Sequence, residues 1–63
     1  MWILRYYRYH SLQEYEGDTK EECLKFGVNG EEEGELSMHE LVSPDGEVVM
    51  NKKQLFDHWL SQH

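Results

Sequence analysis

Cysteine, proline and long apolar runs are nearly missing from this sequence, which has one cysteine and one proline in 63 residues. The lone Cys23 cannot form a disulfide within the chain, whereas disulfide frameworks stabilise many small secreted domains. Arg5 and Arg8 interrupt the first apolar segment, and no segment approaches the roughly 18 consecutive apolar residues that a membrane-spanning helix needs. We therefore expect a soluble, cytoplasmic protein with no signal peptide and no membrane contact.

Basic residues are also scarce: six Lys and Arg stand against thirteen Asp and Glu, a formal net charge of −7. Affinity for nucleic acid depends largely on Lys and Arg that neutralise phosphates, so this balance argues against a nucleic-acid partner. Residues 16–35 hold eight of the acids beside two lysines: Glu16, Asp18, Glu21, Glu22, Glu31, Glu32, Glu33 and Glu35. We expect the partner to be another protein with a basic surface.

Sequence motifs for metal binding and catalysis are missing as well. The four histidines, His10, His39, His58 and His63, do not form the close pairs that zinc sites usually use, and Cys23 has no second cysteine. No phosphate loop, nucleophile elbow or dinucleotide fingerprint occurs. We therefore predict no metal, no cofactor and no catalytic residue.

Two features could still suggest an enzyme. Cys23 near a helix start could be an activated thiol, but the surrounding acids raise a thiol pKa, and a buried structural cysteine is the better interpretation. The carboxylates of Glu31, Glu32 and Glu33 could act as acid or base, but such chemistry needs a water-poor cleft, and glutamates beside glycines are typical of a solvated loop. We predict that the protein is not an enzyme.

The densest apolar segment, residues 2–10, predicts a β-strand, because β-branched and aromatic side chains suit a pleated, half-buried surface. Successive side chains point to opposite faces of a strand. One row contains Trp2, Leu4, Tyr6 and Arg8, and the other contains Ile3, Arg5, Tyr7 and Tyr9. We predict that the Trp2 row faces the core and that the Ile3 row faces away from it.

Residues 11–17 are mainly polar and are predicted to form a loop in which Leu12 and Tyr15 pack. A helix follows. Thr19 and Glu22 have the spacing of a capping box, in which each side chain accepts a hydrogen bond from the other residue's backbone N–H.

The end of this helix is less sharply marked. Gly27 interrupts its apolar stripe, and Asn29-Gly30 is a strong stop signal, so we place the helix at residues 19–28. The alternative is a further turn through Glu33, with Gly34 as the terminating residue.

The remaining chain predicts a hairpin and a second helix. Residues 36–42 and 47–50 read as strands around the turn Ser43-Pro44-Asp45-Gly46. Asn51 caps a helix over residues 52–61, with Gln54 as its capping-box partner. The apolar face of that helix contains Leu55, Phe56, Trp59 and Leu60.

These elements predict one α+β domain over residues 1–63, in the order β-α-β-β-α. The simplest arrangement is a small two-layer domain, with a three-stranded sheet and both helices on one face. A chain of this length has few spare apolar elements with which to cover the other face. The order of the strands stays open.

A row of tyrosines and an arginine on a bare sheet face is typical of a contact surface, because Tyr and Arg are enriched at interface hot spots. We predict a protein-binding module with the binding residues Ile3, Arg5, Tyr7, Tyr9, Glu31, Glu32 and Glu33. The alternatives are a homodimer joined through the row, a single-stranded nucleic-acid platform on which bases stack, and a row covered by the helices or the 11–17 loop.

Two segments carry a resemblance. Gly30-Glu31-Glu32-Glu33-Gly34-Glu35-Leu36-Ser37, followed by Val42-Ser43-Pro44-Asp45-Gly46-Glu47-Val48-Val49, resembles short orphan proteins of bacteria and their phages over about half of the chain. The resemblance implies no enzymatic activity. It implies that a tiny acidic domain of this kind acts by binding, as an inhibitor or modulator of a host nucleic-acid-handling protein, some such proteins presenting carboxylates where DNA phosphates would lie.

Overall fold

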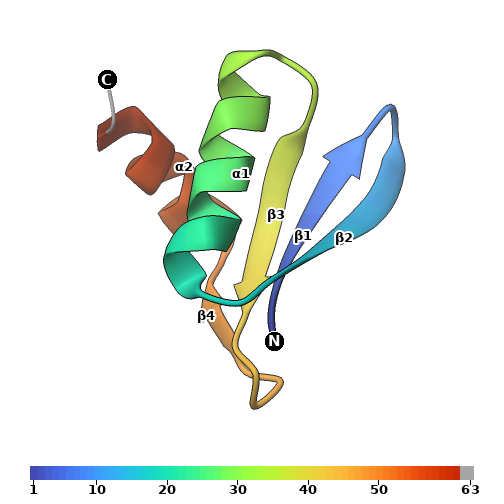
Figure 1. Ribbon diagram of the computed structural model, residues 1–63. Coiled ribbons are helices and arrows are strands. Elements are labelled where there is room, and N and C mark those ends of the chain that lie inside the picture. Colours follow the sequence, from blue (N-terminus) through green and yellow to red (C-terminus); the bar gives the residue numbers. More distant parts are fainter. Residues whose placement is uncertain (62–63) are drawn as a thin grey trace.

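The computed structural model describes residues 1–61, so the expectation about His63 lies outside the described residues. Its elements are β1 (Trp2–Arg8), β2 (Ser11–Gly17), α1 (Lys20–Glu32), β3 (Ser37–Val42), β4 (Val48–Met50) and α2 (Lys52–Ser61) (Figure 1). The strands form an antiparallel sheet in the order β2-β1-β3-β4. The α+β class is confirmed, but the prediction of three strands is wrong, because the described residues form four.

The additional strand, β2, forms from the segment that was expected to be a loop. It lies at the edge of the sheet and pairs with β1 from Arg8↔Ser11 to Trp2↔Gly17. Most of its side chains are exposed, and Tyr15 is half-buried. A polar segment can form such a strand, because an antiparallel edge strand needs few buried side chains and keeps one face in water.

Helix α1 begins where its capping signal predicts and ends later than its stop signal predicts. The Thr19 hydroxyl accepts a hydrogen bond from the Glu22 N–H (3.1 Å), as predicted. The Glu22 carboxylate accepts one from the Asp18 N–H (3.0 Å), where the Thr19 N–H was the predicted donor. The helix continues through Asn29-Gly30 to Glu32, so the end at residue 28 is wrong and the longer alternative is right to within one residue.

The end of α1 is a Schellman motif. The Gly34 N–H donates to the Glu31 carbonyl (3.1 Å), and the Glu35 N–H donates to the Gly30 carbonyl (2.9 Å). Gly34 has a φ of 72°, the left-handed conformation that this motif requires and that glycine adopts without strain. The chain is thereby turned back toward β3.

Gly27 and Gly30 lie inside α1 because the helix packs on the sheet through them. A Cβ on Gly27 would collide with the side chains of Met38 and Leu4, and a Cβ on Gly30 would collide with that of Leu36. The two residues that seemed to weaken the helix therefore bring it close to β1 and β3. The cost of a helical glycine, about 1 kcal/mol relative to alanine, is offset by this packing.

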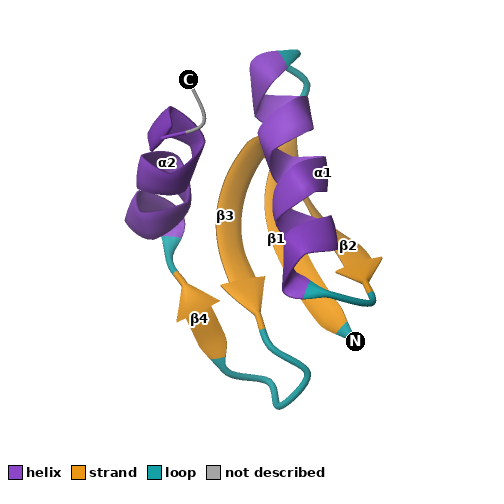
Figure 2. Cartoon of the chain, turned by 60° about the vertical axis from the view of Figure 1, so that its left-hand side comes forward, coloured by secondary structure: helices purple, strands orange, loops and turns teal. Residues whose placement is uncertain are grey.

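One core fills the space between the helices and the sheet; its buried members are Leu4, Cys23, Leu24, Leu36, Met38, Leu41 and Leu55. Trp2 and Tyr6 pack against it, so the inward row is confirmed except for exposed Arg8. Because α1 supplies Cys23 and α2 supplies Leu55, both helices lie on the same side of the sheet. Figure 2 shows α1 in front of β1 and β2, with α2 beside β3 and above β4.

The C-terminal hairpin and α2 have the predicted bounds to within one residue. Asn51 and Gln54 form a reciprocal capping box, with both hydrogen bonds at 2.9 Å. Leu55 is fully buried, but Phe56 and Leu60 are 51% and 49% exposed. The predicted apolar face of α2 is therefore too wide, because the helix presents only a narrow stripe to β3 and β4.

The close packing of α1 predicts the effect of Gly27→Ala. Alanine should stabilise a helix by about 1 kcal/mol, but its methyl group overpacks Met38 and Leu4 at a cost of about 1–3 kcal/mol. We expect a net loss of stability in urea-induced unfolding. Asn29→Ala, at an exposed position of the same helix, is the control and should be neutral or slightly stabilising. A more stable Gly27→Ala variant would show that α1 lies farther from the sheet.

Candidate functional site

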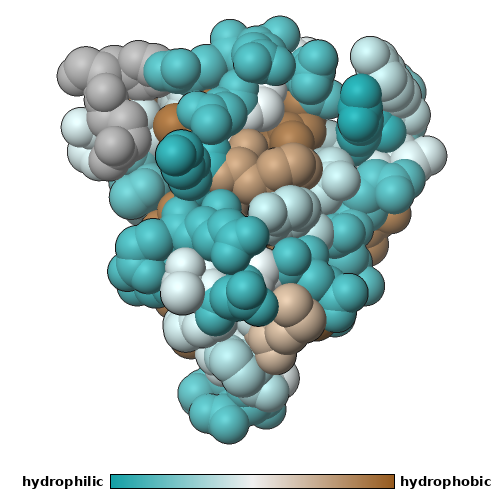
Figure 3. All heavy atoms as spheres, viewed as in Figure 1, coloured by the Kyte–Doolittle hydropathy of each residue, from teal (hydrophilic) through white to brown (hydrophobic). Residues whose placement is uncertain are grey.

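The side of the sheet opposite the core is the first part of the candidate site. Its residues come from all four strands and are called the open face: Ile3, Arg5, Tyr7, Leu12, Glu14, Glu16, Glu40, Val42 and Val48. Both described helices pack on the other side, so neither lies over this face. Tyr7, Leu12 and Val48 are exposed, whereas Val42 is buried. Figure 3, which has the view of Figure 1 with α1 in front, does not present the open face; hydrophilic residues there surround a smaller apolar area in the upper half of the molecule.

Arg5 lies at the centre of the open face between two carboxylates. Its Nε donates to Glu14 on β2 at 3.0 Å, and its guanidinium also donates to Glu40 on β3. The hydrogen bond to Glu14 and then that to Glu40 raise the pKa of Arg5. Arg5 thus bridges three strands, and its charge is neutralised by this chain's own carboxylates.

The aromatic surface continues from Tyr7 onto β3. The Tyr7 and His39 rings meet edge to face with centroids 5.2 Å apart. The register between β1 and β3 shifts at Arg5/Tyr6, which leaves His39 as an extra residue in β3. Such a bulge turns a side chain that would otherwise follow the strand's alternation, and here it places an imidazole beside Tyr7.

Tyr9 does not continue the row. β1 ends at Arg8, and Tyr9 and His10 form the two-residue turn to β2 with φ values of 51° and 68°. Two consecutive left-handed residues indicate a type I′ turn, which usually contains Asn-Gly. Tyr9 is 79% exposed, and the Arg8 guanidinium carbon lies 5.6 Å from its ring centroid.

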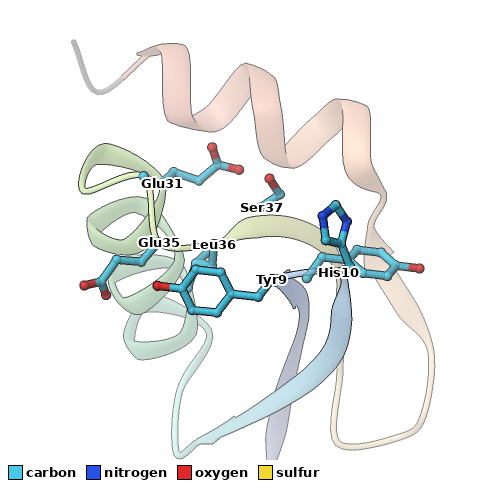
Figure 4. Close-up of a pocket in the computed structure, with 8 residues that line it drawn as sticks. Tyr9, His10, Glu31, Glu35, Leu36 and Ser37 are labelled. Carbon is cyan, nitrogen blue, oxygen red and sulfur yellow. The ribbon is translucent and has the colours of Figure 1, made fainter.

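A groove of about 470 Å³ lies where this turn faces the end of α1. We call it the Tyr9 groove; it is lined by Tyr7, Tyr9, His10, Glu31, Gly34, Glu35, Leu36 and Ser37. Figure 4 shows Tyr9 extending from the β1–β2 turn toward the loop that carries Glu35 and Leu36. Two segments far apart in the sequence therefore form one site.

The structure separates the seven predicted binding residues into three places. Tyr7, Tyr9 and Glu31 line the groove. Ile3 and Arg5 lie farther along β1 on the open face. Glu32 and Glu33 form the last helical position and the C-cap of α1, beside the groove but not among its lining residues.

Glu31 has a structural contact as well as a place in the groove. Its Oε1 accepts a hydrogen bond from the Met38 N–H (3.0 Å), which ties the end of α1 to the start of β3. Figure 4 shows its side chain directed toward Ser37. Glu35, on the loop that follows α1, is exposed.

The charge at this end of α1 is unusual. A helix C-terminus carries a partial negative charge and is stabilised by cations. The last turn of α1 contains no basic residue, and Glu31, Glu32 and Glu33 occupy its final positions and cap. The carboxylates and the helix dipole therefore repel each other beside the groove.

Sequence reasoning missed four lining side chains, those of His10, Glu35, Leu36 and Ser37. In the structure, residues 2–8 and 11–17 pair along their full length and flank two residues, which is the spacing of a tight hairpin. Tyr9-His10 lacks the Asn or Gly that would normally mark that turn, so the segment resembled a loop.

Cys23 is fully buried, and burial raises the pKa of its thiol. Within residues 1–61, no three His, Cys, Asp or Glu side chains are grouped to hold a metal ion. Neither described helix has the length and apolar character needed to cross a membrane.

No protein-family model, curated protein or solved structure matches this chain.

The burial of Cys23 predicts slow reaction with a thiol reagent under native conditions, about a hundredfold or more below the rate in denaturant, since modification requires opening of the fold. An exposed thiol in Cys23→Ala/Glu47→Cys is the control and should react at once. Because the folded pKa is raised, the contribution of Cys23 to stability is present below the unfolded pKa and is lost as pH rises beyond about 9. Fast native modification would contradict the packing of α1.

The strained turn predicts that Tyr9→Asn/His10→Gly stabilises the fold. Residues suited to a type I′ turn should recover about 1–2 kcal/mol of backbone strain, while loss of the exposed Arg8–Tyr9 contact should cost about 0.5 kcal/mol. We expect a net gain of about 1 kcal/mol in chemical denaturation. Tyr7→Ser, which leaves the turn intact, should show no such gain. Destabilisation of the double variant would mean that the Tyr9 side chain holds the hairpin together.

Proposed function

We propose that the protein is a non-catalytic binding module that recognises a basic surface of another protein through the open face. The observation that carries this proposal is the combination of exposed Tyr7, Leu12 and Val48 on a sheet face that no described helix covers. Tyr7 and Leu12 at one end of the face and Val48 at the other supply apolar contact area, and the Arg5–Glu14–Glu40 cluster between them supplies charged contacts.

The charge of the open face supports a basic partner. Glu14, Glu16 and Glu40 outnumber Arg5, whose guanidinium is already paired with two of them. The acidic residues 16–35 extend the same sign of charge along the molecule. Opposite charge on the partner would speed encounter and select against acidic proteins.

The same charges argue against the other occupants. A nucleic-acid platform needs cations for phosphates, and Arg5 is neutralised by Glu14 and Glu40. Two copies stacked through the open face would bring their carboxylates together, which is unfavourable in a partly desolvated interface. The finer form of the proposal is a cytoplasmic modulator of a nucleic-acid-handling protein, whose phosphate-binding surface is basic. This form follows the short proteins of bacteria and their phages that residues 30–37 and 42–49 resemble.

The proposal predicts which variant loses its partner. Immobilised parent protein, Tyr7→Ser/Leu12→Ser and Leu60→Ser are compared for the proteins that each retains from lysate in low salt. Leu60 is about as exposed as Leu12 but lies on α2, away from the open face, so it is a matched control for lost apolar surface.

We expect a basic protein to be retained by the parent and by Leu60→Ser, and to bind the open-face variant about tenfold more weakly, as the loss of a hot-spot tyrosine implies. Binding should weaken as salt is raised, because exposed charges are screened within about 8–10 Å. Equal retention by all three proteins, or a retained partner that is acidic, would refute the proposal. Circular dichroism confirms that each variant is folded.

A further inference from the structure

We infer that the Tyr9 groove is a binding site for an arginine side chain of the partner protein. The inference rests on the proposed function and deepens it, because it names the residue type that anchors the basic partner. The groove lies beyond the Tyr7 end of the open face, and Tyr7 belongs to both surfaces. A partner seated on the open face can therefore extend one side chain into the groove.

The electrostatics of the groove favour a cation. Glu31 and Glu35 line it, no Lys or Arg is among its described lining residues, and Arg8, whose guanidinium carbon lies 5.6 Å from the centroid of the lining Tyr9 ring, is the one cation shown in contact with a lining side chain. It opens beside the C-terminal end of α1, where the helix dipole adds negative potential and where Glu33 caps a last turn that contains no basic residue. A bound cation would reduce the repulsion between these carboxylates and the end of the helix.

The shape of the groove favours guanidinium over ammonium. The flat Tyr9 ring stands at its side, and the guanidinium of Arg8 in this same chain already lies 5.6 Å from that ring's centroid. A planar guanidinium can stack on a tyrosine and donate paired hydrogen bonds to a carboxylate, whereas an ammonium acts as a point charge. The Glu31 carboxylate is held in place by the Met38 N–H, so it is oriented before a ligand arrives.

Backbone conformation and charge around the groove are both unfavourable to the stability of the free protein. Tyr9 and His10 adopt left-handed conformations that Asn and Gly would adopt more easily. Glu33, which caps α1 beside the groove, follows a last turn without a basic residue, where a lysine would interact favourably with the helix dipole. Residues that lower stability and lie together around one groove are expected at a binding site, because function rather than stability selects them there.

The test uses N-acetyl-arginine amide as the probe and the matching citrulline derivative, which has the same shape without the charge, as the control ligand. Each is titrated into the folded protein while backbone amide resonances are followed by NMR. We expect the arginine derivative to cause saturable shifts confined to residues 7–10 and 31–37, and the citrulline and lysine derivatives to cause markedly smaller ones.

Three variants locate the site. Tyr9→Asn/His10→Gly removes the ring from a turn that should become more stable. Glu31→Gln/Glu35→Gln removes the charge, while the side-chain amide oxygen introduced at position 31 can still accept a hydrogen bond from the Met38 N–H. Each of these two double variants should bind the arginine derivative about fivefold more weakly than the parent, which is the effect of losing one cation–π or ion-pair contact. Glu47→Gln, an exposed acid in the β3–β4 turn, should leave the affinity unchanged.

Two outcomes overturn the inference: equal shifts with arginine and citrulline derivatives, or shifts that Glu47→Gln reduces as much as the groove variants do. Equal affinity for the lysine derivative overturns the assignment to arginine. The test needs no protein partner, so its result is independent of the proposed function. If the probe binds but Tyr7→Ser/Leu12→Ser captures the partner as well as the parent does, the proposed function is refuted and the groove assignment stands. If the probe fails to bind but capture of the partner still depends on Tyr7 and Leu12, the groove assignment is refuted and the proposed function stands.

Discussion

Helix α1 lies unusually close to the sheet, and the packing of the core follows from this close approach. Gly27 leaves room for Met38 and Leu4, and Gly30 leaves room for Leu36. In a chain of this size the buried area is small, so stability depends on how closely its few layers pack. The seating of Leu36 against Gly30 also positions the turn after α1, and with it Glu35 and one side of the Tyr9 groove.

Ion pairs connect the strands on the open face, the side of the sheet opposite α1. Arg5 ties β2, β1 and β3 together through Glu14 and Glu40, so the one cation at the centre of the open face serves the fold and leaves a net negative surface. Exposed ion pairs add little to stability on their own, and the consequence of this arrangement lies more in what the surface attracts. The exposed apolar residues of the face and the acids around them fit the same kind of partner.

The open face and the Tyr9 groove form one continuous candidate surface, but the two parts differ in shape and polarity. The face offers flat apolar area, and the groove offers a concave, acidic and aromatic site beyond one end of it. Tyr7 belongs to both, which makes it the residue through which the two proposals connect. The groove is also where backbone conformation and helix charge depart furthest from what stability alone would select.

Local sequence patterns were sufficient to predict the features that depend on neighbours a few residues apart: the Thr19 cap, the Asn51/Gln54 box, the turn at residues 43–46 and the inward position of Leu4. They also located Tyr7, Tyr9 and Glu31, but not their meeting in one groove. Three features could not be predicted in this way: residues 11–17 form a strand, α1 continues through Gly30, and Tyr9 turns out of its row. Each of these outcomes is set by contacts across the fold, such as pairing with β1 and packing against Leu36, whose energies outweigh the local preferences of polar residues and glycine.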